Sequence, residues 1–402
     1  ASPTSLLIRA TDAQLNPWIV HTDEYRETEI GIGIVKLVPQ SDGTVIGLAS
    51  ASSVGLDPES RQQGCIFKLN ANGTVDTSFA DHGFALLSHP DFESIEPRDV
   101  AIQNDGKVIV AFIASRLDRN LLLTRINTNG SVDLSFGDSG FVEYDSGIED
   151  QPASVNIDDQ QRIMVANNIW SNQPSVQILR FSSQGVLDGD YVPTAINAAL
   201  GASIEISKMK IDAEQRSVVI GSVDNNGQTM GFIARLTSDG ALDPTFSSGG
   251  FTLVDLNDPN TADSYSRLED LAIAPSGRIA AIGFGNTPNM NEAIVFFTQD
   301  GNVDTTVANG TGVSLFDSKE NVTYSETYSI ESDGDGFLVV GGGSEFGGYS
   351  ETNWGLDSAF ATVLRFSSNG MLDTAFDADG RYFPTKQSVV RIGLELRHHL
   401  LP

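Results

Sequence analysis

Residues 240–251 read Gly-Ala-Leu-Asp-Pro-Thr-Phe-Ser-Ser-Gly-Gly-Phe, and the opening of this stretch, Gly-x-(Val/Leu)-Asp, occurs six times in the chain. In most copies a Phe stands three residues after the Asp, and a Gly stands four residues after that Phe. A seventh, eroded copy reads Leu15-Asn16-Pro17-Trp18. The anchoring aspartates are 55 to 69 residues apart: Asp76, Asp133, Asp188, Asp243, Asp304 and Asp373. A period of this length and regularity indicates an architecture built from one recurring unit.

The segments between the copies read as strands. One of them, residues 99–111, places two short apolar runs around a Gly-bearing turn, and similar pairs recur in the other units. A further apolar run leads into each copy, and another follows it. No stretch carries a sustained helical period, so the sequence predicts an all-β chain with about four strands per unit.

Four antiparallel strands repeated about seven times are too many for one open sheet, whereas radial blades bury each sheet face against the next blade. We therefore predict a single β-propeller domain over residues 1–402, with seven four-stranded blades favoured and six as the alternative. Strands from both ends, residues 6–10 and the segment after Gly380, are expected to close the ring and remove its free edges.

Residues 242–246, Leu-Asp-Pro-Thr-Phe, with Gly249 and Gly250 behind them, resemble the delta-60 repeat of bacterial propeller proteins. The resemblance extends from about Leu6 to Gly380. It implies a propeller fold and a largely bacterial, often surface or secreted setting. That family carries no general activity, so the resemblance assigns no catalytic residue.

The composition is strongly acidic, with 24 Lys and Arg against 53 Asp and Glu and a net charge of −29. This charge argues against nucleic acid and anionic membranes as partners, because phosphate-binding surfaces need clustered cations. No apolar run approaches the roughly 20 residues of a membrane span, so no membrane insertion is expected. A mature chain beginning Ala1-Ser2-Pro3 is what signal removal leaves, which favours an extracellular, cell-surface or periplasmic location. Cys65, the one cysteine, lies in an apolar strand and is expected to be a buried, inert thiol.

An Asp in every unit can be interpreted as a ring of metal ligands, but its neighbours are turn-forming residues. We expect the carboxylate to accept backbone N–H bonds in a turn, and the motif Phe to pack between blades. Eight residues before the Asp, five units carry a cation that we expect to pair with a carboxylate in an adjacent strand or blade: Lys68, Arg125, Arg180, Arg235 and Arg365.

Two Asp-rich clusters are calcium candidates because they offer several hard oxygen ligands within a short turn. They comprise Asp373, Asp377 and Asp379 in one cluster and Asp333 and Asp335 in the other. Neither matches the full EF-hand loop, and the first overlaps the repeat motif itself. Ordinary turns are therefore favoured, with weak or absent calcium dependence and no other cofactor.

Enzymatic motifs are sparse in this sequence. The five histidines have no zinc-site spacing, and neither a Gly-x-Ser-x-Gly elbow nor a Gly-Lys-Ser/Thr phosphate loop occurs. Paired carboxylates for glycoside hydrolysis remain an alternative, because 53 acidic residues supply many candidates.

The connections on the face opposite the motif are the variable ones, and they include residues 167–175, 255–269 and 342–358. Rigid scaffolds place recognition on such loops, although aromatic residues there can also fold back over the blade ends. The aromatic candidates for binding are Trp170, Phe346, Tyr349 and Trp354. The sequence thus predicts a non-catalytic binding or scaffold propeller that engages a protein or polysaccharide. The alternative is a glycan-active hydrolase or lyase with carboxylates at the channel mouth.

Overall fold

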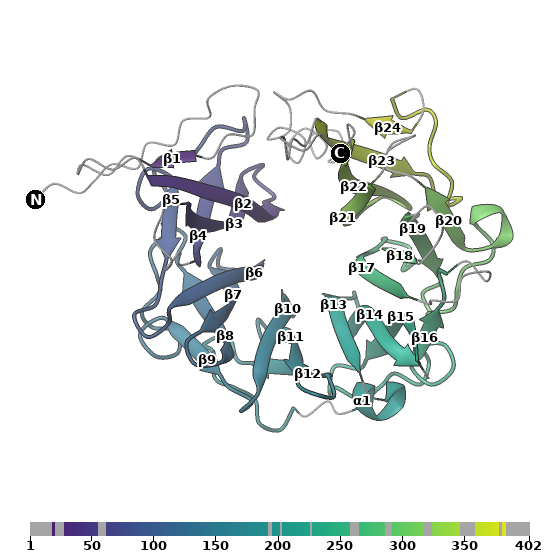
Figure 1. Cartoon of the computed structure of the whole chain (residues 1–402), viewed down its shortest axis with the longest axis horizontal. Coiled ribbons are helices and arrows are strands. Elements are labelled where there is room, and N and C mark those ends of the chain that lie inside the picture. The colour runs from purple at the N-terminus through teal and green to yellow at the C-terminus, as the bar shows by residue number, and fades with distance from the viewer. Residues whose placement is uncertain are drawn as a thin grey trace, which may run out of the picture. The chain divides into compact units, whose positions relative to one another are not determined.

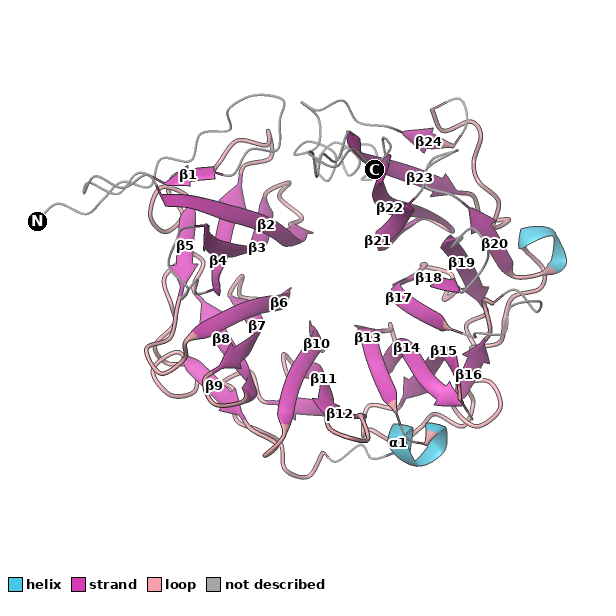
Figure 2. Ribbon diagram, in the orientation of Figure 1, coloured by secondary structure: helices cyan, strands magenta, loops and turns pink. Residues whose placement is uncertain are grey.

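The computed structural model describes residues 18–20, 28–54, 62–191, 195–201, 203–225, 227–257, 265–285, 292–316, 324–345, 358–377 and 380–382. Strands make up nearly all of the regular structure, and helical turns occur at α1 (Ala195–Leu200) and η1 (Ala308–Gly310) (Figure 2). None of the helices in these ranges is long and apolar enough to cross a membrane.

Contacts divide the chain into two units, which are described separately. Unit 1 holds residues up to 172 together with 178–190, and unit 2 holds 173–177 together with 191–385. The prediction of a single domain stays a prediction.

Unit 1 contains three antiparallel sheets in succession, and Figure 1 shows them as neighbours along the chain. The first has the order β1 (Trp18–Val20), β2 (Thr28–Pro39), β3 (Val45–Val54), β4 (Gln62–Leu69), β5 (Phe84–Leu87). The second consists of β6 (Ser94–Ile102), β7 (Val108–Ser115), β8 (Arg119–Ile126) and β9 (Phe141–Tyr144). The third consists of β10 (Glu149–Ile157), β11 (Ile163–Trp170) and β12 (Ser175–Phe181), although the start of β12 belongs to unit 2.

Unit 2 contains three four-stranded antiparallel sheets of the same kind. The fourth sheet consists of β13 (Ile204–Ile211), β14 (Ser217–Asn225), β15 (Gln228–Leu236) and β16 (Phe251–Val254). The fifth consists of β17 (Ser266–Ile273), β18 (Ile279–Gly285), β19 (Glu292–Phe297) and β20 (Val313–Phe316). The sixth consists of β21 (Tyr324–Asp333), β22 (Gly336–Glu345), β23 (Ser358–Phe366) and β24 (Arg381–Tyr382).

The described residues form six blades, so the favoured prediction of seven is wrong and the alternative of six holds. The eroded N-terminal copy does not begin a blade of its own. Its Trp18 starts β1, which pairs with β2 through Trp18↔Ile30 and adds a fifth strand to the first sheet. Residues 6–10 and 389–396 lie outside the described residues, so closure of the ring by both ends stays a prediction.

The third blade has three strands in the described part of the chain, and its motif copy is one that lacks the Phe. At the start of β12, the side chain of Asn197 in α1 contacts the backbone of Val176. Its Oδ1 accepts from the N–H of Val176 at 3.1 Å, and its Nδ2 donates to the carbonyl at 2.7 Å. In the fourth blade the corresponding strand pairs instead with β16. The amide of Asn197 therefore takes over one backbone pairing of a fourth strand.

The motif aspartates sit in turns, as predicted. The Oδ1 of Asp133 accepts from the N–H of Ser135 at 3.1 Å and from its hydroxyl at 2.6 Å. The motif Phe136 is fully buried between strands of the second and third blades, which confirms that it packs between blades. Gly140 closes the turn with a φ of +101°, where only glycine is unstrained.

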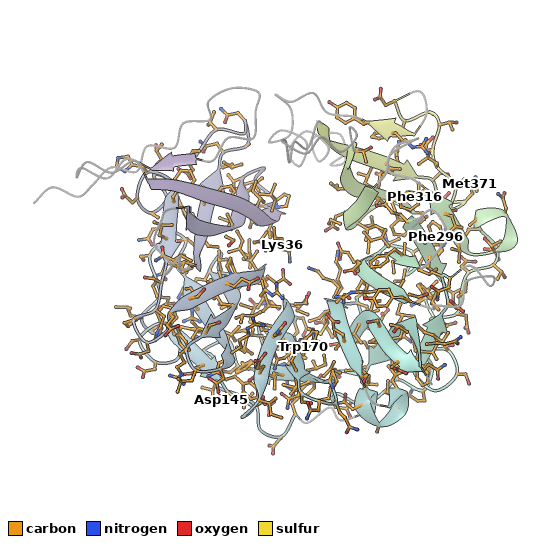
Figure 3. The ribbon with its side chains drawn as sticks, viewed as in Figure 1. Lys36, Asp145, Trp170, Phe296, Phe316 and Met371 are labelled. Carbon is orange, nitrogen blue, oxygen red and sulfur yellow. The ribbon has the colours of Figure 1, made fainter. Side chains whose placement is uncertain are left out.

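All five predicted cations lie close to the motif aspartate of their own repeat, and Arg365 also lies 2.7 Å from Asp333 of β21. Arg125 places Nε 2.8 Å from Asp133, donates to the carbonyl of Ser183 in the third blade, and covers the ring of Phe136. In the fifth blade this position holds Phe296, and Arg278 from the neighbouring hairpin replaces it: its Nε lies 3.1 Å from Asp304. The motif aspartate of the fifth blade therefore still pairs with a cation, although that cation comes from a different position in the repeat. Figure 3 shows Phe296 with Phe316 in the same region.

One strand of each blade carries a β-bulge and is hereafter called the leading strand: β2, β6, β10, β13, β17 and β21. The residues that follow the six bulges in chain order are Lys36, Asp99, Ser154, Lys208, Asp270 and Ser329. The same three residue types thus occur in the same order in each unit. In unit 1, Asp99 is buried and accepts from the ammonium of Lys36 at 2.6 Å and from the hydroxyl of Ser154 at 3.0 Å. In unit 2, Asp270 accepts from the hydroxyl of Ser329 at 3.1 Å.

Candidate functional site

Of the four aromatic residues predicted to bind a partner, the structure describes Trp170 (Figure 3). It ends β11, pairs across the sheet with Glu149, and is 42% exposed. Arg119 lies 3.9 Å from Glu149, so a cation and an acid accompany the exposed indole. Phe346, Tyr349 and Trp354 lie outside the described residues.

The calcium candidates are partly described, and a cation of the chain already lies between two of them. Arg365 places its guanidinium 2.7 Å from Asp333 and 3.6 Å from Asp373. Asp335 and Asp377 are exposed in turns, and Asp379 lies outside the described residues. In the described ranges, no three His, Cys, Asp or Glu side chains are grouped to hold a metal. Calcium binding stays a prediction.

Cys65 behaves as predicted for a structural thiol. It is 2% exposed, and burial raises the pKa of its thiol to about 12. A thiol that stays protonated at neutral pH is a poor nucleophile and a poor metal ligand.

A cluster of polar and aromatic side chains lies on the leading strand of the fifth blade, β17. Along β17 and the residue before it, Tyr265, Arg267 and Glu269 alternate with buried Ser266 and Leu268. Because side chains in a strand alternate between faces, the first three project to the same, solvent-facing side.

A second aromatic ring completes the apolar part of this cluster. Phe284 of β18 pairs directly with Arg267, and its ring lies 5.8 Å from that of Tyr265 at an interplanar angle of 32°. Tyr265 is 41% exposed and Phe284 36% exposed. The two rings therefore present a common aromatic surface to solvent instead of folding into the core.

Arg267 joins the ionic part of the cluster across two blades. Its Nη1 lies 2.8 Å from Glu205 of β13, and its Nε lies 2.7 Å from Glu269. Burial alone would lower the pKa of Arg267, but the charges of Glu269 and Glu205 outweigh it and hold the pKa above its usual range. The guanidinium is thus permanently charged and fixed from two sides. We call Tyr265, Phe284, Arg267, Glu205 and Glu269 the β17 site.

The backbone of Tyr265 is held in place from outside the sheet. The side-chain oxygen of Asn257 accepts its N–H at 2.9 Å, and Tyr265 also forms a parallel bridge with Thr229. The segment carrying Asn257 packs against Gly285, where a Cβ would overlap the carbonyl oxygen of Leu256. The aromatic surface is therefore supported by a fixed backbone, which lowers the entropic cost of binding on it.

The two carboxylates of the β17 site, Glu205 and Glu269, lie beside or within β-bulges. In β17 the register shifts between Leu268 and Asp270, so Glu269 is the extra residue of the bulge. Gly283 lies opposite, where a Cβ would overlap the carbonyl oxygen of Arg267. Gly221 plays the same part opposite Glu205 in β13. Each glycine allows the bulged strand to approach its neighbour closely.

The β17 site was not predicted because residues 255–269 were expected to form a variable loop. In the structure, β17 begins at Ser266, and Tyr265 already bridges to Thr229. The alternation of Tyr265, Arg267 and Glu269 with Ser266 and Leu268 was the signal that could have extended the strand. The pairing of Arg267 with Glu205, 62 residues away, has no local signal.

Three stretches of the chain match the family described as "Domain of unknown function (DUF5122) beta-propeller": residues 40–79, 103–136 and 217–246. Each stretch ends at a motif phenylalanine: Phe79, Phe136 or Phe246. The chain therefore carries repeats of a β-propeller family. The narrower resemblance to delta-60 repeats stays a prediction.

Among solved structures, a protein of unknown function from Dyadobacter fermentans is 11% identical, with a TM-score of 0.49 over 81% of this chain and 93% of that one. One of unknown function from Bacteroides caccae is 13% identical, with a TM-score of 0.39 over 75% and 93%. A PL25 ulvan lyase, a polysaccharide lyase, is 10% identical, with a TM-score of 0.45 over 93% and 82%. No curated protein sequence matches the chain. These likenesses assign no activity to it.

Proposed function

We propose that this protein is a non-catalytic, extracellular polysaccharide-binding propeller and that the β17 site contacts the glycan. The observation that carries the proposal is the exposed, tilted pair of Tyr265 and Phe284 beside the Arg267 ion pairs. Aromatic rings left in water at a fixed position are costly unless a ligand covers them, and a pyranose ring presents an apolar C–H face of matching size.

The polar groups of the site supply the orientation that stacking lacks. Glu205 and Glu269 keep acceptor capacity beyond their contacts with Arg267, since a carboxylate has about four lone-pair sites. Hydroxyl groups of a stacked sugar are donors that match these oxygens. Ligand sites typically combine an apolar surface with a few fixed polar groups, and the β17 site has both.

The alternative is a glycan-active hydrolase or lyase, and one observation favours it: two carboxylates from different blades converge on the same site. Glycoside hydrolysis uses such pairs, with one acting as an acid and the other as a base or nucleophile. Here both carboxylates contact one guanidinium, that of Arg267, so each is engaged by a permanent cation. We therefore favour binding without cleavage.

Affinity gel electrophoresis with a panel of soluble polysaccharides, followed by calorimetry on those that retard the protein, tests the proposal. The Tyr265→Ala/Phe284→Ala double variant should lose retardation while its circular dichroism and melting temperature stay near those of the wild type. Trp170→Ala removes the exposed aromatic of unit 1 that the sequence suggested for binding, and it should bind normally if the glycan lies on the β17 site instead. Normal binding by the double variant would refute the β17 site, and release of new reducing or unsaturated sugar ends would favour the enzyme.

A further inference from the structure

We infer that the polysaccharide bound at the β17 site is electrically neutral, an inference that rests on the proposed function and names its ligand class. The first reason is the charge of the site itself. The guanidinium of Arg267 faces two carboxylates, Glu205 at 2.8 Å and Glu269 at 2.7 Å, so the cluster carries a net negative charge.

Neighbouring groups on the leading strands of unit 2 do not reverse that sign. The two lysines of β13 are Lys208 and Lys210, and Lys210 lies 3.4 Å from Glu331 of β21. Asp270, next to Glu269, adds another carboxylate. The sequences of β13, β17 and β21 together hold three cationic and six acidic residues, in a chain whose net charge is −29. An anionic polymer would approach a surface of its own sign.

The second reason is the state of the cation that an anionic sugar would need. Arg is the usual partner of uronate and sulfate groups because its planar fork binds them in a bidentate manner. Two nitrogens of Arg267, Nη1 and Nε, already face Glu205 and Glu269. A ligand carboxylate that bound the guanidinium in a bidentate manner would have to displace Glu205 from Nη1 or Glu269 from beside Nε, and it would then lie beside both acids. The arrangement rejects an anion by like-charge contact as well as by occupancy.

A neutral sugar meets neither obstacle. Its hydroxyl groups donate to the two carboxylates and accept from the outer edge of the guanidinium, while its C–H face covers Tyr265 and Phe284. No charge has to lose its partner, so the ion pairs that position the site persist in the complex.

The inference is tested with polymers that share a backbone and differ in charge: hydroxyethyl cellulose with carboxymethyl cellulose, and dextran or galactomannan with their sulfated forms. Affinity electrophoresis and calorimetry at low salt should show the neutral member of a pair binding at least tenfold more tightly. The difference should shrink at 0.5 M NaCl, because salt screens the repulsion. Equal or tighter binding of the anionic member would overturn the inference.

Charge variants separate this inference from the proposed function. Glu205→Gln/Glu269→Gln should gain affinity for the anionic members, whereas Glu331→Gln, a matched loss of an acid outside the site, should not. If the wild type binds both members of a pair equally, and Tyr265→Ala/Phe284→Ala loses both, the proposed function stands and the neutral-ligand inference falls. If the aromatic double variant binds like the wild type, the proposed function itself falls. Failure of every neutral polymer to bind would overturn both.

Discussion

At the scale of single residues, each repeat has a guanidinium or ammonium group that forms an ion pair with the aspartate of its motif turn. Arg235 is 2% exposed, lies 2.8 Å from Asp243, donates to the carbonyl of Gln299 in the next blade and covers Phe246. The sequence predicted the turn aspartate and the inter-blade Phe from local patterns. It did not predict the partner of the cation, because a spacing of eight residues from strand to turn has no helical or strand period that indicates contact.

Arg235→Gln should therefore lower the free energy of unfolding by about 3 kcal/mol, because buried Asp243 loses its 2.8 Å partner and keeps only the longer, 3.5 Å contact with Arg216 as an ion pair. Arg365→Gln is the matched control at the same repeat position. Its side chain is 41% exposed, so the loss should stay below about 1 kcal/mol. Urea unfolding followed by tryptophan fluorescence measures both. Equal losses in the two variants would contradict a role that depends on burial.

The buried motif aspartates should also govern acid stability. Burial alone would raise the pKa of Asp133, but the hydrogen bonds from Lys107 and Ser135 and the charge of Arg125 outweigh it and hold the pKa well below its usual range. The pKa of Asp243 and of Asp304 is lowered in the same way. A carboxyl whose pKa is lower in the folded state contributes stability that is complete above the unfolded pKa, about 4, and is lost as the pH falls towards the folded value.

Stability measured by urea unfolding should accordingly be flat from about pH 6 to 5 and fall steeply below pH 4. Asp243→Asn should be less stable at pH 6, with a shallower acid decline, because one fewer proton is taken up on unfolding. Asp335→Asn removes an exposed turn carboxylate and should leave the decline unchanged. A decline of identical slope in wild type and Asp243→Asn would show that this aspartate is not responsible.

At the scale of elements, bulges in the leading strands decide which side chains reach the surface. The strands themselves could be predicted from alternating apolar residues, and most were. The bulges could not, because one inserted residue shifts the pattern without a signal that a single sequence separates from a loop. Residues 265–269 alternate ahead of the bulge in β17 but were assigned to a variable loop, and the β17 site was missed for that reason.

Gly283→Ala should disturb the fifth blade, since the added Cβ would overlap the carbonyl of Arg267 and force the bulge to shift. We expect a loss of about 2 kcal/mol or more in the free energy of unfolding, together with weaker glycan binding. Gly189→Ala, where a Cβ meets no atom within 4 Å, is the control and should change stability by no more than about 0.5 kcal/mol. Denaturant unfolding and calorimetry report the two effects. Unchanged binding in folded Gly283→Ala would show that the bulge does not position the site.

At the scale of the whole chain, six blades and not seven account for the repeats in the described residues. The count was overestimated because an eroded motif looks the same in sequence whether it begins a blade or adds a strand to one. The order Lys, Asp, Ser after the bulges reveals a larger period. Lys36 and Lys208, Asp99 and Asp270, and Ser154 and Ser329 are 172, 171 and 175 residues apart, so the pattern repeats every three blades. That period matches the two units defined by contacts.

Asp99 and Asp270, which accept hydrogen bonds from residues on other leading strands, should each stabilise the blades of their own unit. Asp99 accepts from Lys36 and Ser154, which lie on the leading strands of the first and third blades. Asp99→Asn should raise backbone hydrogen exchange at least tenfold in β2, β6 and β10, and Asp270→Asn should do so in β17 and β21. Mass spectrometry of the full-length chain resolves these segments. A uniform rise in exchange rate across both units in either variant would show that the aspartate does not stabilise its own blades specifically.

Calorimetric titration of the wild type with a neutral polysaccharide, beside Tyr265→Ala/Phe284→Ala and Trp170→Ala, tests the central claim most directly. The account predicts measurable binding by the wild type and by Trp170→Ala, and affinity at least about tenfold weaker, a loss of about 1.4 kcal/mol, for the folded double variant. Undiminished binding by the double variant would contradict it.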